Sequence, residues 1–225
     1  MVRYLWRREI GYGLHYLNKH NPECALKHFR FALSACPVSN RNELNRILYF
    51  LGVTLKRLGL NGPAVKSWSA GRTLYRGGYA SVMYQRHVNQ YGMAKQASVE
   101  LDDWNAFYSI QLERYVTSKR SRKLGSEGER DMIWDLIYDN WVVLLQSGIL
   151  TNKSVCEKWR IFSQQEIIFP FFNVPISPSK EPIRVDFQEK SKVELDDPCP
   201  CHSGLSFLKC CGRTKSEEEI VYGVF

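Results

Sequence analysis

The sequence predicts an all-α fold: paired helical repeats or a helical bundle, followed by a small metal-binding module on a flexible linker. Three observations support this. A repeat of thirty-nine residues organises the first third of the chain. Apolar residues fall at helical spacing through much of the remainder, and helix-start signals precede several of these stretches. Hydrophobic residues make up 44% of the 225, which is enough to bury a core.

Each copy of the repeat contains a small residue, a second small residue twelve positions later, an aromatic residue four further on and a small residue three beyond that. The positions are Gly13, Ala25, Phe29 and Ala32, then Gly52, Ala64, Trp68 and Gly71. This order predicts two antiparallel helices that cross closely, with one large ring between them. Asn21-Pro22 and Asn61-Gly62-Pro63 would start the second helix of each pair, and Gly62 could also end the helix before it.

The pattern resembles the tetratricopeptide repeat, and Pro37 falls where that family ends its second helix. The resemblance assigns residues 1–79 to two such repeats and implies a concave groove that binds an acidic protein or peptide. Alternatively, the same side chains pack against a neighbouring helix. The lining residues would be Arg7, Ile10, Leu14 and Leu17 from the first copy and Arg46, Tyr49, Val53 and Lys56 from the second.

The apolar pattern of residues 80–172 predicts further helices. Tyr91-Gly92 lies forty residues after Leu51-Gly52, so a degenerate third pair is expected across residues 80–115. Helical spacing from Met132 to Leu145 predicts a buried helix face. A last helix is expected over residues 152–165, followed by an apolar cluster at residues 167–172.

Residues 173–197 are rich in Pro, Ser, Lys, Glu and Asp. This composition predicts a flexible tether that leaves the C-terminal module free to move relative to the helices.

Four cysteines lie within thirteen residues near the C-terminus: Cys199, Cys201, Cys210 and Cys211. Thiolates bind zinc at about 2.3 Å, and a structural site closes with four such ligands. The spacing therefore predicts one structural zinc ion, with iron as the less favoured metal. His202 could replace one sulfur. The other cysteines, Cys24, Cys36 and Cys156, are expected to be buried free thiols.

The same segment resembles the SEC-C motif, the metal-binding tail of the SecA translocation motor. Cys199-Pro200-Cys201, Ser203-Gly204 and Cys210-Cys211-Gly212 fall on its pattern in register, while His202 replaces the usual Gly. The resemblance implies a zinc module at residues 198–212 that docks to other proteins, including a chaperone or the ribosome. Residues 213–225 would form a tail.

Charge is distributed unevenly along the chain. Residues 1–80 contain thirteen Lys or Arg against three Asp or Glu, so this part attracts acidic partners. Nucleic acid or the ribosome is the rival partner, and the basic cluster Lys119, Arg120, Arg122 and Lys123 is its candidate site.

The sequence favours a protein that is not an enzyme, because it contains none of the phosphate-binding, nucleophile-elbow or zinc-protease motifs. No apolar run reaches the roughly 18 residues of a membrane span, and residues 1–8 lack the apolar segment of a signal peptide. A cytoplasmic adaptor is expected. The sequence leaves the oligomeric state open.

Overall fold

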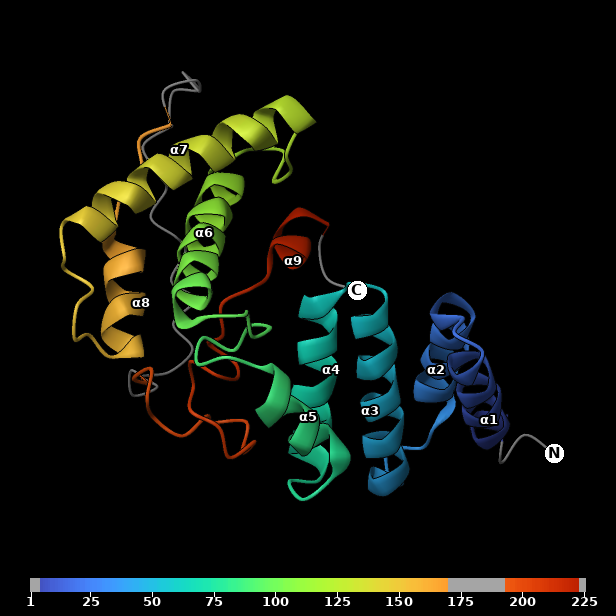
Figure 1. The fold of residues 1–225 in the computed structure, drawn as a ribbon. Coiled ribbons are helices and arrows are strands. Elements are labelled where there is room, and N and C mark those ends of the chain that lie inside the picture. Colours follow the sequence, from blue (N-terminus) through green and yellow to red (C-terminus); the bar gives the residue numbers. More distant parts are fainter. Residues whose placement is uncertain (1–4, 170–192, 223–225) are drawn as a thin grey trace.

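The computed structural model describes residues 5–169 and 193–222 (Figure 1). This described part is all-α and contains no strand, as predicted, with only two isolated β-bridges. None of its helices combines the length and hydrophobicity that a membrane span requires. The helices are α1 (Leu5–Asn18), α2 (Pro22–Ala35), α3 (Arg41–Arg57), α4 (Asn61–Leu74), α5 (Tyr79–His87), α6 (Val99–Ser118), α7 (Glu127–Gln146), α8 (Val155–Gln164) and α9 (Glu217–Val221).

Helices α1 to α4 form two helical hairpins that lie side by side, and α5 packs against α3 and α4 (Figure 1). The predicted close crossing is present in both hairpins. A Cβ atom added to Gly13 would lie 2.7 Å from the Phe29 ring, and one added to Gly52 would collide with the Trp68 ring. The thirty-nine-residue repeat therefore has a physical basis, since each glycine makes room for one buried ring.

The starts of the second helices differ between the two hairpins. The Asn21 side chain caps α2 by accepting a hydrogen bond from the Cys24 N–H at 3.0 Å, as predicted. In the second hairpin the prediction for Gly62 is wrong. Gly59, with φ +77°, takes the left-handed conformation after α3, and Gly62 lies inside the first turn of α4.

A second hydrophobic core surrounds α6, which packs against α7, α8 and α9. The predicted third helical pair is wrong, because α5 and α6, both fully described, do not pack on each other. Tyr91 and Gly92 lie in the loop between these helices, which spans residues 88–98. Gly92 has φ +74°. This left-handed backbone favours glycine, so Gly92 belongs to a turn and not to a helix crossing.

Side chains from the start of α6 hold the loop of residues 88–98 in place. Asn89 donates to Asp102 at 2.8 Å, and the Tyr91 hydroxyl donates to Asp103 at 2.6 Å. Lys158 of α8 forms an ion pair with the same Asp103, also at 2.6 Å. These bonds fix the loop to α6, and the Tyr91 ring also meets Phe162 of α8, with centroids 6.2 Å apart.

Helix α8 begins three residues later than predicted. Asn152 has a left-handed backbone with φ 59°, and Ser154 starts the helix in a capping box with Glu157. Of the apolar cluster that follows, Ile167 and Phe169 pack on the second core, whereas Ile168 is exposed. Residues 170–172 of that cluster and 173–192 of the predicted linker lie outside the described residues.

Candidate metal centre

Backbone hydrogen bonds fold residues 197–212 into a compact loop. The Phe207 N–H donates to the Asp197 carbonyl and the Cys199 N–H donates to the Leu205 carbonyl, both at 2.8 Å. The Gly212 N–H returns to the Phe207 carbonyl at 2.8 Å. These bonds place the first pair of cysteines opposite the second pair.

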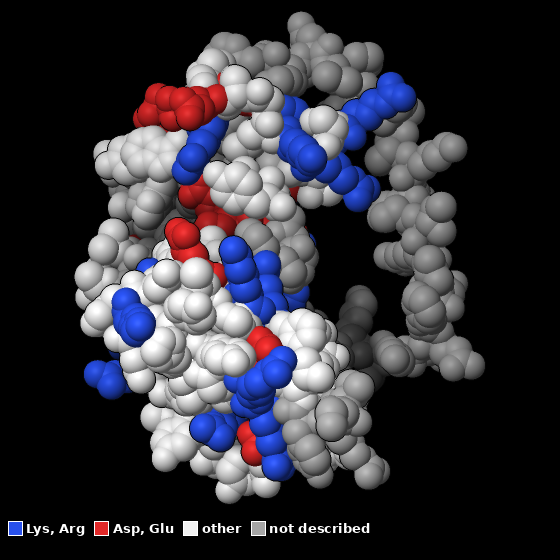
Figure 2. All heavy atoms as spheres, turned by 90° about the vertical axis from the view of Figure 1, so that its right-hand side faces the viewer, with Lys and Arg blue, Asp and Glu red and all other residues white. Residues whose placement is uncertain are grey.

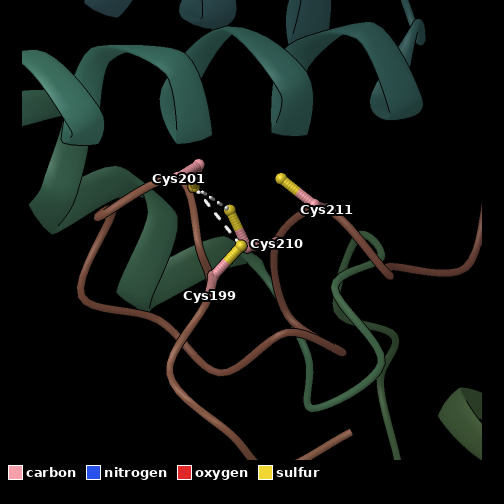
Figure 3. A group of neighbouring side chains, drawn as sticks. All are labelled: Cys199, Cys201, Cys210 and Cys211. Atoms are coloured by element: carbon pink, nitrogen blue, oxygen red, sulfur yellow. Dashed lines mark hydrogen bonds between the residues drawn. The ribbon is translucent and has the colours of Figure 1, made fainter. Parts of the chain in front are cut away.

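The four cysteine side chains converge on one point (Figure 3). Their sulfur atoms all lie within 4.8 Å of one another. The Cys201 Sγ lies 3.3 Å from the Sγ of Cys199 and 3.3 Å from that of Cys210. Cys199 is buried and Cys210 half-buried, while Cys201 and Cys211 are exposed.

These residues fit a tetrahedral metal ion. Four sulfurs at about 2.3 Å from one zinc ion are separated from each other by about 3.8 Å. The observed sulfur–sulfur distances range from 3.3 Å to at most 4.8 Å, on both sides of that value. Small side-chain rotations would therefore complete the tetrahedron. The fourth ligand closes the site, which leaves no open position of the kind a catalytic metal needs.

The protonation of the cluster also suits a cation. Burial raises the pKa of the Cys201 thiol, but hydrogen bonds from Ser203, Cys210 and Cys199 outweigh burial and lower it to about 6. Burial raises the pKa of Cys210 to about 11, with a contribution from the neighbouring cysteines. The first thiolate therefore forms readily, while further ones repel each other. A divalent cation removes that repulsion.

The other residues of the motif have structural roles. Gly204 has φ +74°, and a Cβ on Gly212 would collide with the Phe207 ring. Ser203 is fully buried and its hydroxyl lies 3.2 Å from the Cys210 sulfur. His202 has φ 60°, which explains why this position suits glycine. Within the described residues, the group of side chains that could hold a metal ion contains only the four cysteines. His202 is therefore not placed as a ligand.

The module packs against the first helical unit, which is formed by α1 to α5, so the prediction of a module free to move is wrong. Arg76 donates to the His202 carbonyl at 2.6 Å, and the Tyr84 hydroxyl donates to the Lys209 carbonyl. Leu205 joins the core formed by α1 to α5. Gly92 touches the module so closely that a Cβ there would meet the Leu208 carbonyl oxygen at 3.2 Å.

The segments on either side of the module bind the second helical unit, which is formed by α6 to α8, and the loop of residues 88–98 before it. The Thr214 N–H donates to the Tyr91 carbonyl, and Trp159 donates to the Thr214 hydroxyl, each at 3.2 Å. Before the module, the Cys156 thiol donates to Asp196 at 2.8 Å. Residues 193–222 therefore lie between the two helical units and contact both (Figure 1).

The described part of the tail, residues 213–222, is folded. Helix α9 contacts α6 and α4, and Arg213 and Glu219 form an ion pair that is mostly buried. Gly62 of α4 lies against Ser216 and Glu219, where a Cβ would collide with both. Lys215 reaches Glu113 of α6 at 2.6 Å.

The structure does not bring the eight predicted groove residues together on one open surface. Ile10 and Leu17 are buried in the cores of the first unit, so they cannot line an open groove. Leu14, Tyr49 and Val53 are partly buried against the same cores, because neighbouring helices cover them. Only the three cations, Arg7, Arg46 and Lys56, are exposed.

The predicted nucleic-acid cluster divides in a similar way. Arg120, Arg122 and Lys123 are exposed on the connector between α6 and α7. Lys119 instead forms an ion pair with Glu129 of α7, so it is not available to bind phosphate. Of the remaining cysteines, Cys36 and Cys156 are buried as predicted, whereas Cys24 is only half-buried.

The residues that receive the C-terminal segment were not predicted from the sequence, namely Arg76, Tyr84, Gly92 and Trp159. Most of these contacts end on backbone atoms of the partner segment. Their spacing in the chain follows no local period. The one available signal was Gly92, a glycine outside any helix, which the repeat spacing attributed to a helix crossing.

Comparison with known proteins gives a short match to a SecA protein. A segment of 36 residues is 50% identical to the protein translocase subunit SecA of Caldicellulosiruptor saccharolyticus. It covers 16% of this chain and 4% of that SecA. Together with the cysteine cluster, the match fits a tail like the SEC-C motif. The chain matches no protein-family model and no solved structure.

Proposed function

We propose that this chain is a zinc-binding adaptor without enzymatic activity. The observation that carries the proposal is the cluster of four sulfurs within 4.8 Å of one another, and the 36-residue match to a SecA supports it. Zinc is the favoured metal, because an all-sulfur tetrahedral site suits it and a closed site needs no redox chemistry. Iron is the alternative.

The proposed metal has a structural role. The cysteine loop receives hydrogen bonds from Arg76 and Tyr84 of the first unit, and its flanks bind Tyr91 and Trp159. Without the metal, a loop this short has little apolar surface of its own to hold its shape. The metal-bound module would therefore hold the two helical units in one relative arrangement.

The proposed partner is an acidic protein or peptide bound by the first helical unit. Lys and Arg side chains gather on the face that Figure 2 shows, which is the side of Figure 1 where α1 and α2 lie. Arg7 and Arg46 are exposed on α1 and α3. Such a field raises the association rate of acidic partners. A place in cytoplasmic protein export or at the ribosome would agree with the likeness to SecA.

RNA is the second candidate partner. Its support is the excess of ten positive charges over residues 1–80, together with the exposed cations Arg120, Arg122 and Lys123. Phosphate binding depends steeply on salt, whereas a surface that also uses apolar contacts loses less affinity.

Fluorescence anisotropy with two probes tests the partner class: a peptide of alternating Glu and Leu, and a single-stranded oligouridine. We expect the peptide to bind, and Arg7→Glu/Arg46→Glu to weaken binding by roughly tenfold. The matched control is Lys95→Glu/Lys153→Glu, which reverses two exposed charges outside residues 1–80.

Tight oligouridine binding that falls by about 10³-fold between 50 and 200 mM salt would favour RNA instead. Equal weakening by the control pair would contradict a binding surface on the first unit.

A further inference from the structure

Helix α7 is an outer helix with an unusually apolar exposed side. It lies across the end of α6 (Figure 1), on which it packs, and its Trp141 ring also meets the Phe162 ring of α8 at 5.9 Å. Its buried side consists of Ile133, Ile137, Trp141 and Leu144. Five further large apolar residues are exposed: Met132, Trp134, Tyr138, Val143 and Leu145. Trp134, Tyr138 and Leu145 share one side of the helix by their spacing, and exposed apolar side chains that lie together mark interaction sites.

The aromatic part of this side is held in a fixed arrangement. The rings of Trp134 and Tyr138 stack with their centroids 5.1 Å apart. Trp104 of α6 supports both rings edge-on, at 6.0 Å from Trp134 and 5.6 Å from Tyr138. Because these rings are already ordered, they lose little additional conformational freedom when a partner binds.

Three carboxylates run beside the rings. Asp131, Asp135 and Asp139 are exposed and spaced four residues apart, which places them along one side of the helix. None of them forms an ion pair with a described residue, whereas their neighbours Glu129 and Arg130 are paired with Lys119 and Glu217. Like charges at this spacing destabilise a helix, so the arrangement is unfavourable unless a cationic partner is present.

We propose that α7 binds a cationic amphipathic helix of another protein. The binding surface, here called the α7 surface, consists of Trp134, Tyr138, Asp131, Asp135 and Asp139. Lys or Arg side chains spaced by four residues would meet the three carboxylates, and one of them would lie on the ordered rings as a cation–π contact. Apolar side chains of the partner would cover the rings.

The charge of the α7 surface excludes the other macromolecular classes. Nucleic acid and anionic membranes are repelled by three carboxylates, although both could bind exposed rings. A second copy of this chain is the remaining competitor, since its first helical unit is basic. The proposal uses no residue of the metal centre or of the basic face, so it is independent of the proposed function.

The test is binding of a fluorescein-labelled eighteen-residue helical peptide with Arg at every fourth position and Leu three residues after each Arg. Anisotropy is measured on the full chain at about 50 and 150 mM salt. We expect Asp131→Asn/Asp135→Asn/Asp139→Asn to weaken binding at least tenfold. Trp134→Ala should weaken it at both salt concentrations, because the ring contact is only partly electrostatic.

The matched control is Glu23→Gln/Glu100→Gln/Glu166→Gln, which removes three exposed carboxylates elsewhere and should change binding less than twofold. A peptide of the same composition in scrambled order should bind more weakly than the patterned one. Thermal unfolding checks that each variant is folded.

The proposal is overturned if the wild-type chain does not bind the patterned peptide, or if both triple variants lose affinity equally. Sedimentation of the unliganded chain gives the last check. Self-association that the three Asp→Asn changes abolish would identify a second copy as the occupant and also overturn the proposal.

Discussion

At the scale of single residues, two glycines determine how closely the helices of each hairpin approach. Gly13 lies against Phe29 and Gly52 against Trp68, with no room for a Cβ atom in either case. Both rings are almost completely buried. The backbone must shift or the ring must move if either glycine is replaced, and close-packed interiors resist both.

Gly52→Ala should therefore destabilise the fold by about 1–3 kcal/mol through overpacking against Trp68. Gly11→Ala is the control, because Gly11 is an exposed residue of α1 with no atom within 4 Å of an added Cβ. That change should stabilise the protein by about 0.5–1 kcal/mol through helix propensity. Urea unfolding measures both, and a neutral Gly52→Ala would refute the close crossing.

His202 offers a second test at this scale. Its φ of 60° is strained for histidine and easy for glycine. His202→Gly should therefore raise the stability of the module by up to about 1 kcal/mol and leave the bound metal unchanged. A loss of metal on this substitution, measured by elemental analysis, would show that the ring is a ligand after all.

At the scale of elements, the short helix α9 depends on one buried ion pair. Burial alone would raise the pKa of Glu219, but Arg213 and the Ser216 N–H hold it below its ordinary value. A carboxylate with a lowered pKa contributes stability above its unfolded-state pKa of roughly 4.3. That contribution is lost as the pH falls through the folded-state value.

Glu219→Gln should therefore destabilise the docked tail by about 3 kcal/mol at pH 7, because it leaves the Arg213 guanidinium without its counter-charge. Hydrogen exchange of the α9 amides measures this. The difference between variant and wild type should shrink as the pH falls below about 4. Comparing the two proteins at each pH removes the effect of thiolate protonation, which they share. A constant difference would contradict the assignment.

Local signals predicted most of the helices correctly. Asn21 and Pro22 start α2, and apolar spacing places the buried face of α7 on Ile133 and Ile137. The error at Tyr91-Gly92 has a different origin. Spacing alone cannot distinguish a glycine at a helix crossing from one that admits a distant segment, and Gly92 is of the second kind.

The cysteine cluster was predictable because metal binding fixes residue types and spacing. The docking of the module was not. It rests largely on the carbonyl oxygens of His202, Lys209 and Tyr91, which every residue type possesses. Such contacts leave no side-chain pattern in the sequence. The polar composition of residues 173–197 therefore indicated a module free to move, whereas residues 193–222 contact both helical units.

At the scale of the whole molecule, the C-terminal segment joins two hydrophobic cores. Leu205 belongs to the core of the first unit, while Ile220 and Val221 pack against the core of the second. The contacts on Arg76, Tyr84 and Trp159 all pass through this segment. If metal binding gives the cysteine loop its shape, the metal also determines how firmly the units are coupled.

Chelation under reducing conditions should therefore increase hydrogen exchange in the loop of residues 88–98, in α5 and in α8. The α1–α2 hairpin, which α3 and α4 separate from the C-terminal segment (Figure 1), should keep its protection and serves as the internal control. Unchanged exchange around Tyr91 after the metal is removed would show that docking does not depend on it.

The most direct test of the central claim is the metal content of the purified protein, measured by elemental analysis under reducing, chelator-free conditions. The account predicts one zinc ion per chain. Cys199→Ser/Cys210→Ser should remove it, whereas Cys24→Ser/Cys36→Ser, which changes two cysteines outside the cluster, should retain it. A wild-type chain without bound metal, or a cluster variant that still binds one equivalent, would contradict the account.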